Sequence, residues 1–179
     1  AVLAAHRQVL ARFPQALLLW APRHPERFAA AIEQAEAAGL QVAHRREHRW
    51  PAPSTQCFVI DTLGELVGFY ACADVAFVGG SLQAIGGHNV LEPAALGVPA
   101  LVGPHTFNFE DVTQLLLDAG GVRRIDDAES LAREVIELFA DEGLRRQCGQ
   151  AARARALSER GALDRTLRVI EERMMPAAG

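Results

Sequence analysis

The sequence contains no lysine, and all 18 of its basic residues are arginine, which we attribute to genome composition. Acidic residues outnumber basic ones, which gives a formal net charge of -4 and an isoelectric point of about 5.9. A nucleic-acid-binding protein usually carries a basic surface, so this balance argues against that class. There is no apolar run of about 18 residues or more, so no membrane-spanning helix is predicted. We expect no signal peptide, because a helical pattern begins at Ala1.

Cysteine is also scarce, and several common motifs are absent. Cys57, Cys72 and Cys148 lie far apart and match neither zinc nor disulfide spacing, so we expect ordinary buried thiols in a reducing compartment. No segment reads G-x-G-x-x-G or G-x-x-x-x-G-K-[ST], which argues against ordinary dinucleotide binding and P-loop hydrolysis. His88 and His105 have no acidic or histidine neighbours at metal-ligand spacing, so we interpret them as polar loop residues.

Short apolar strands alternate with amphipathic helices along the 179 residues. Strands are expected at residues 16–21, 40–44, 56–60, 74–78, 98–102 and 122–125. The continuous apolar run at 16–21 is typical of a strand buried on both faces. This alternation predicts one α/β domain, in which helices cover both faces of a parallel sheet. In such sheets ligands bind beyond the carboxyl ends of the strands.

Two glycine-rich loops follow the strand at residues 74–78. They contain Gly79-Gly80-Ser81 and Gly86-Gly87-His88-Asn89, and a helix with Glu92 in its first turn comes next. Glycines let the backbone approach a ligand, and a helix N-terminus offers unpaired N–H groups to an anion. We therefore predict a nucleotide or phosphate site, with the amides of residues 87–90 directed at one oxyanion. The alternative is two tight loops that only join strands to helices.

Three side chains near these loops each have two interpretations. Arg23, after the strand at 16–21, can bind a phosphate through two hydrogen bonds or lie at the surface of a turn. The Ser81 hydroxyl can bind a phosphate or carboxylate, or the local backbone. Glu92 would repel a phosphate, so it either accepts hydrogen bonds from sugar hydroxyls or compensates the helix dipole.

Helix-capping patterns occur at three places. Thr62 and Glu65 form a possible capping box, Asn108 is expected to cap a helix, and Asp126 with Glu129 gives a third signal.

Four basic residues precede Trp50 and form either a basic patch or a solvated loop; they are Arg45, Arg46, His48 and Arg49.

The motifs resemble those of the 3-deoxy-D-manno-octulosonic acid (Kdo) transferases of lipopolysaccharide synthesis, from about residue 1 to about residue 175. The segments that carry the resemblance are Pro22-Arg23-His24-Pro25-Glu26-Arg27-Phe28, Asp61-Thr62-Leu63-Gly64-Glu65-Leu66, Phe77-Val78-Gly79-Gly80-Ser81-Leu82, Gly86-Gly87-His88-Asn89, Leu91-Glu92-Pro93 and Gly103-Pro104-His105-Thr106-Phe107-Asn108-Phe109. Val90 departs from the pattern, because proline is frequent there in the family.

The resemblance implies a GT-B glycosyltransferase with two Rossmann-like domains, of which residues 1–179 form the C-terminal, donor-binding one. The acceptor domain, which carries the catalytic base, and the membrane-associated N-terminal region are then absent. We also expect the first strand of the Rossmann-like sheet and its Gly/Ser/Thr-rich loop to be missing, which would expose a sheet edge. The fragment is expected to be soluble and inactive alone, whereas the full-length protein would act at the cytoplasmic face of the bacterial inner membrane.

The implied reaction transfers Kdo from CMP-Kdo to a lipid A precursor with inversion, and needs no cofactor and no metal ion. No catalytic residue is expected in this fragment. The implied donor-binding residues are Pro22, Arg23, Leu63, Gly64, Gly79, Gly80, Ser81, Gly86, Gly87, His88, Asn89 and Glu92. Among them Arg23 and the helix entry at 86–89 would hold the CMP phosphate, with help from Ser81 and Asn89. Glu92 would bind the ribose hydroxyls, and Pro22 with Leu63 and Gly64 would flank cytosine.

Two other functions remain open on the residues alone. A different GT-B enzyme, a transferase or epimerase that uses a UDP-sugar, also places a glycine-rich loop and a helix-borne glutamate at its nucleotide. A non-catalytic nucleotide-binding module is the other alternative. The Gly-Gly-His-Asn run at residues 86–89, together with Pro-Arg-His-Pro at 22–25, favours the Kdo transferases.

Overall fold

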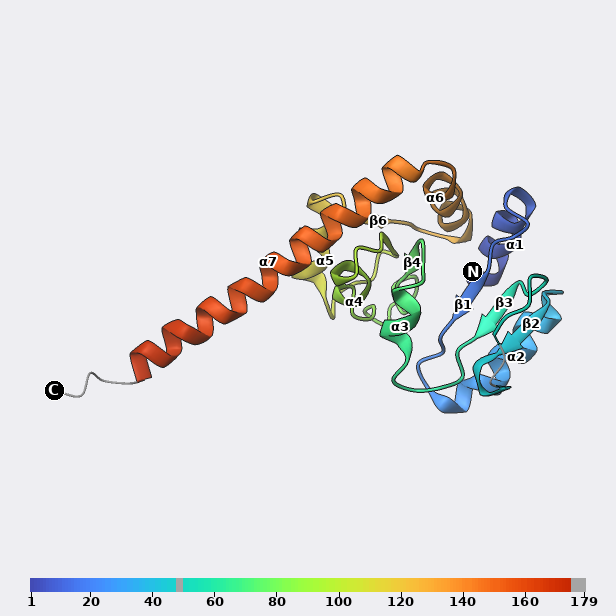
Figure 1. Cartoon of the computed structure of the whole chain (residues 1–179), viewed down its shortest axis with the longest axis horizontal. Coiled ribbons are helices and arrows are strands. Elements are labelled where there is room, and N and C mark those ends of the chain that lie inside the picture. Colours follow the sequence, from blue (N-terminus) through green and yellow to red (C-terminus); the bar gives the residue numbers. More distant parts are fainter. Residues whose placement is uncertain (48–49, 175–179) are drawn as a thin grey trace.

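The computed structural model of the chain describes residues 1–47 and 50–174 (Figure 1). It contains six short parallel strands: β1 (Leu18–Trp20), β2 (Val42–His44), β3 (Cys57–Val59), β4 (Ala76–Phe77), β5 (Ala100–Val102) and β6 (Val122–Arg124). All of them fall inside the strands expected from the sequence. The α/β architecture with parallel strands is thereby confirmed. Of the four basic residues before Trp50, His48 and Arg49 lie outside the described residues.

The strands form two three-stranded sheets, with the orders β1-β3-β2 and β4-β5-β6. Among the described residues no hydrogen bond joins the two sheets, so β1 and β4 each lie at a sheet edge. The expectation that the strand at residues 16–21 is buried on both faces is wrong, because β1 lies at a sheet edge. β1 is half-buried along its length, whereas β3, in the centre of its sheet, is fully buried. A strand is buried on both faces only when neighbours cover it on every side.

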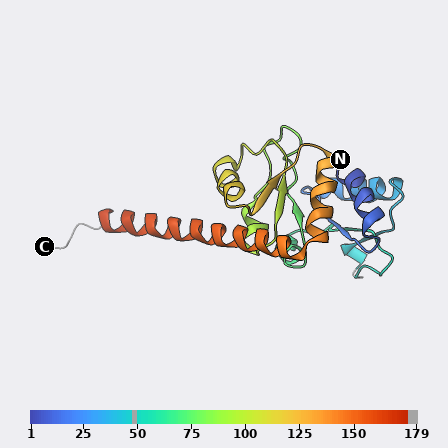
Figure 2. The ribbon, with the colours of Figure 1, turned by 90° about the horizontal axis from the view of Figure 1, so that it is seen from above.

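Except between β2 and β3, where the described residues form only a 3-10 turn, α-helices connect successive strands, and helices cover both sheets (Figures 1 and 2). The helices are α1 (Val2–Arg12), α2 (Phe28–Ala37), α3 (Leu66–Tyr70), α4 (Leu91–Ala95), α5 (Glu110–Asp118), α6 (Ala128–Ala140) and α7 (Glu142–Met174), with two 3-10 turns, η1 (Pro25–Arg27) and η2 (Arg45–Glu47). The C-terminal part of α7 extends away from the rest of the molecule (Figure 1). In the described part of the chain no helix is long and apolar enough to cross a membrane.

In the sheet β4-β5-β6 the central strand β5 is buried on both faces. Ala100 and Val102 pack with α4, α5 and α7, while Leu101 packs on the opposite face with α1 and α6. Neighbouring residues of a strand point to opposite faces, so three consecutive apolar residues serve two cores. Helix α1 links the sheets, because Ala5 and Val9 join this second core and Leu3 and Leu10 pack against β1 and β3.

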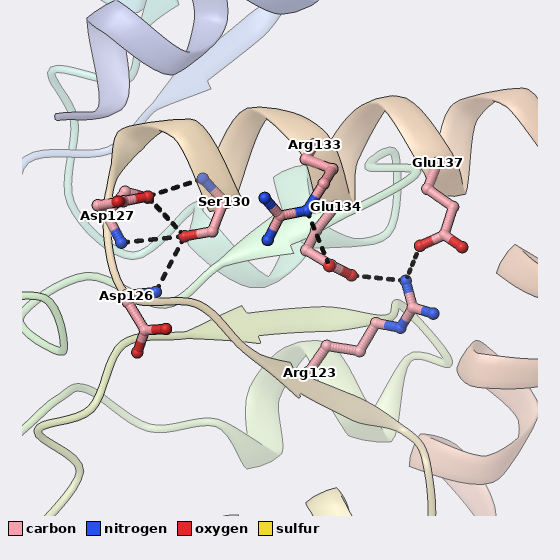
Figure 3. Close-up of polar contacts among 7 residues, drawn as sticks. All are labelled: Arg123, Asp126, Asp127, Ser130, Arg133, Glu134 and Glu137. Atoms are coloured by element: carbon pink, nitrogen blue, oxygen red, sulfur yellow. Dashed lines mark hydrogen bonds and ion pairs between the residues drawn. The ribbon is translucent and has the colours of Figure 1, made fainter.

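One capping signal is shifted by a residue and two are wrong. The capping box of α6 is formed by Asp127 and Ser130 instead of Asp126 and Glu129: the amide of Ser130 donates to Asp127 Oδ1 at 2.7 Å, and Asp127 N donates to Ser130 Oγ at 3.0 Å (Figure 3). Thr62 contacts the side chain of Glu65 and caps no helix.

The expected cap of α5 by Asn108 is also wrong. This helix begins at Glu110 without a side-chain cap, and the Asn108 side chain is bonded to another loop.

The expectation of buried thiols holds for Cys57 and Cys148 but not for Cys72, which is exposed. Burial raises the pKa of the Cys57 thiol to about 12.

Candidate donor-binding site

Three loops follow the carboxyl ends of β1, β4 and β5; we call residues 22–24, 79–89 and 103–108 the carboxyl-end loops. The loop after β5 is tied directly to the loop after β4. His105 N donates to Ser81 O at 2.9 Å, and Asn108 N donates to Gly86 O at 3.0 Å. Since all the strands are parallel, these loops lie where ligands bind in open α/β sheets.

A side-chain contact connects the first of these loops to the second. Arg23 Nη1 lies 3.0 Å from Nδ1 of His88, although 65 residues separate them in the chain. Arg23 is exposed and makes no other hydrogen bond or ion pair within the described residues. Its remaining N–H groups are therefore available to an anion, as a phosphate-binding arginine requires.

The ring of His88 lies over the Gly79–Gly80 turn. A Cβ atom on Gly80 would be 3.4 Å from Cε1 and Nε2 of the ring, and one on Gly79 would be 3.5 Å from Cδ2. Burial, followed by the positive charges of Arg23 and His24, lowers the pKa of His88, and only Glu92 opposes the shift. The site therefore favours a neutral imidazole.

The backbone amides expected to bind one oxyanion are only partly free. Gly87 N donates to Gly80 O at 3.0 Å, and His88 N donates to Gly79 O at 3.1 Å. These two bonds close the loop between β4 and α4, so the prediction that the amides of residues 87–90 act together is wrong. In the described part of the chain the amides of Asn89 and Val90 have no acceptor, and they are the ones that a ligand could use.

Asn89 and Glu92 form a local pair at the start of α4. Asn89 Oδ1 accepts from Leu91 N at 3.0 Å, and Asn89 Nδ2 donates to Glu92 Oε1 at 3.2 Å. The second carboxylate oxygen of Glu92 has no hydrogen-bond partner among the described residues. Burial and the nearby Glu92 charge raise the pKa of Tyr70, in the adjacent helix α3. Glu92 is thus a partly buried acceptor with one carboxylate oxygen that has no partner among the described residues.

Ser81 has a structural role. Its side chain is fully buried, its hydroxyl donates to Val78 O at 2.6 Å, and it accepts from Gly103 N at 2.9 Å. A Cβ atom on Gly103 would overlap the main chain of Ser81 and Leu82. Of the two interpretations of Ser81, the structure therefore favours bonding to the backbone, which holds the loops after β4 and β5 together.

Asn108 has a role that no sequence pattern indicates. Its side-chain amide donates to Ile85 O at 3.2 Å and to Gly87 O at 3.4 Å. Gly86, at φ +100°, makes this approach possible, since a Cβ atom there would lie 2.5 Å from both Asn108 Nδ2 and Phe107 Cε2. The glycine-rich loop is thus shaped by residues that follow β5.

Of the three residues expected to flank cytosine, Pro22 directly precedes Arg23, whereas Leu63 and Gly64 follow β3 and belong to another loop. No hydrogen bond or ion pair between described residues connects Pro22, Leu63 or Gly64 to Arg23, His88 or Glu92. The side chain of Leu63 is 68% exposed, so its apolar surface is open to a ligand.

The loop that carries Leu63 and Gly64 is anchored by a charged cluster that sequence analysis missed. Buried Asp61 accepts from His44 Nδ1 at 3.0 Å and from the amide of Arg46 at 2.9 Å. Arg45 donates to Glu65 at 3.0 Å. The only sequence signal for this cluster is an aspartate at the carboxyl end of a buried strand.

Comparison with known proteins identifies the family. No family model matches the chain. The chain is 43% identical over 171 residues to the 3-deoxy-D-manno-octulosonic acid transferase of Bordetella pertussis and 39% identical to that of Haemophilus influenzae, in each case over 95% of its own length. It also resembles the crystal structure of the C-terminal CMP-Kdo binding domain of WaaA from Acinetobacter baumannii, with a TM-score of 0.82 and 34% identity over 86% of this chain and 80% of that one.

The chain belongs to the Kdo transferase family. It spans 39% and 40% of the length of the two curated relatives named above. The C-terminal domain of the group 1 glycosyl transferase LpcC from Francisella tularensis has the same fold, with a TM-score of 0.63 at 15% identity. Within the described part of this Kdo transferase chain, no three His, Cys, Asp or Glu residues are grouped so that they could hold a metal ion.

Proposed function

We propose that residues 1–179 form the donor-binding domain of a glycosyltransferase that moves Kdo from CMP-Kdo to a lipid A precursor in lipopolysaccharide core synthesis. The observation that carries this proposal is the likeness to the CMP-Kdo binding domain of WaaA. The Arg23–His88 contact at the carboxyl ends of the strands supports it, because a charged donor needs a cation there.

In this proposal each group at the carboxyl-end loops has one role. Arg23 and the open amides of Asn89 and Val90 bind the CMP phosphate. Glu92 accepts hydrogen bonds from the ribose hydroxyls through its second oxygen, and the exposed Leu63 side chain covers one face of cytosine. Ser81 supports the site without touching the donor.

The rest of the reaction lies outside this chain. The acceptor-binding domain and the catalytic base belong to a part that this chain does not contain, so we expect no transfer by residues 1–179 alone. We place the full-length enzyme at the cytoplasmic face of the inner membrane, in contact with the membrane through that other part.

Calorimetric titration with cytidine, uridine and adenosine 5′-monophosphates tests the proposal. We expect CMP to bind more tightly than UMP and AMP, because the family transfers Kdo from a cytidine nucleotide. A preference for UMP would contradict the proposal and favour an enzyme that uses a UDP-sugar.

A further inference from the structure

The contact between Arg23 and His88 determines which ring nitrogen carries a proton. A guanidinium group can only donate hydrogen bonds, so Nδ1 of His88, 3.0 Å from Arg23 Nη1, must accept. Nδ1 is therefore unprotonated, and a neutral ring carries its proton on Nε2. A doubly protonated ring would place two donors face to face.

The loop holds the ring in this orientation. His88 N donates to Gly79 O at 3.1 Å, and the ring lies beside the positions that Cβ atoms of residues 79 and 80 would take, which both glycines leave empty. Gly80 has φ +74°, a conformation that favours glycine, so the place of the ring depends on the turn itself. Arg23, by contrast, is an exposed and otherwise unbonded side chain whose orientation only His88 restricts within the described residues.

The charges around His88 oppose its protonation. Arg23 and His24, from the loop after β1, lower the pKa of His88 in addition to burial, while Glu92 of α4 acts in the opposite direction. Protonation of His88 would remove the acceptor of Arg23 and add a like charge beside it.

We infer that His88 is a positioning residue, whose neutral ring accepts a hydrogen bond from Arg23 and directs that guanidinium toward the phosphate of the donor. This inference rests on the proposed function. It differs from a role as a phosphate ligand, in which His88 would bind the donor directly and would contribute independently of Arg23.

The first test needs no nucleotide. Two-dimensional ¹⁵N NMR of the imidazole rings in the free protein should show the Nε2–H tautomer for His88, with a pKa that rises when Arg23 is replaced in Arg23→Ala. Arg27→Ala, which removes an exposed arginine four residues later, is the matched control and should leave that pKa unchanged. A His88 pKa that is the same in Arg23→Ala and wild type would overturn the inference, whether or not CMP binds.

The second test is a double-mutant cycle on CMP affinity. His88→Leu and Arg23→Ala should each weaken binding by about tenfold or more, and the double variant should be no weaker than Arg23→Ala alone. His88→Asn should retain most of the affinity, because its amide oxygen can replace Nδ1 as the acceptor. Additive losses in the cycle would make His88 an independent ligand and overturn the inference. If the NMR result holds while wild type fails to bind CMP, the proposed function is wrong and the Arg23–His88 pair stands.

Discussion

At the scale of single residues, the site separates groups that face a ligand from groups that hold the loops. Ser81 is fully buried and bonded to the backbone on both sides, so it belongs to the second class. In the proposed function Glu92 belongs to the first, because one of its carboxylate oxygens has no hydrogen-bond partner among the described residues. A carboxylate near a phosphate is useful only when it is directed at neutral donors such as hydroxyl groups.

This assignment of Glu92 predicts a selective effect of Glu92→Gln. Wild type should prefer CMP to 2′,3′-dideoxycytidine monophosphate, and the variant should lose most of this preference, since hydrogen bonds to a charged group contribute about 1.5–3 kcal/mol. Calorimetry with both nucleotides gives the difference directly. An unchanged preference in Glu92→Gln would remove Glu92 from the ribose site and leave it as a helix-dipole residue.

At the scale of elements, the loop after β5 shapes the loop after β4. Gly86→Ala should displace Asn108 and Phe107, whose side chains lie 2.5 Å from the new Cβ atom, and should weaken CMP binding. Gly39→Ala is the matched control, because Gly39 also has a positive φ (+79°) but nothing within 4 Å of its Cβ position. Both variants should lose about 1 kcal/mol or more of unfolding free energy, and only Gly86→Ala should also lose affinity. Equal affinities would show that Asn108 does not shape the site.

A histidine of helix α1 makes the stability of the fold depend on pH. His6 is buried, its Nε2 lies 2.8 Å from Gln56 O, and burial lowers its pKa. The unfolded chain therefore binds a proton more readily than the folded one, and the free energy of unfolding should fall as the pH drops below about 6.5. His88, whose pKa is also lowered, acts in the same direction. Urea unfolding at pH 7 and pH 5 should show a smaller decrease for His6→Gln than for wild type; an identical decrease would contradict this role.

At the scale of the whole molecule, the sequence was enough to predict the α/β class, the positions of the strands along the chain and the family. These depend on local patterns: apolar runs such as residues 98–102, and motifs such as residues 86–89. The sequence could not show that the strands form two separate sheets, because strand pairing depends on residues far apart in the chain. For the same reason, the bonds of Ser81 to Gly103 and of Asn108 to Gly87 appear only in the structure.

Amide chemical-shift mapping during a CMP titration shows whether CMP binds at the carboxyl-end loops, as we propose. We expect the largest shifts in the amides of residues 79–80 and 86–92. Gly97 and Gly149 report on the alternative site, a cavity of about 230 Å³ beside α7 that Leu96, Arg146, Gln150 and Arg153 also line, and their amides should shift least. Shifts concentrated around that cavity, with none at residues 86–92, would contradict the claim.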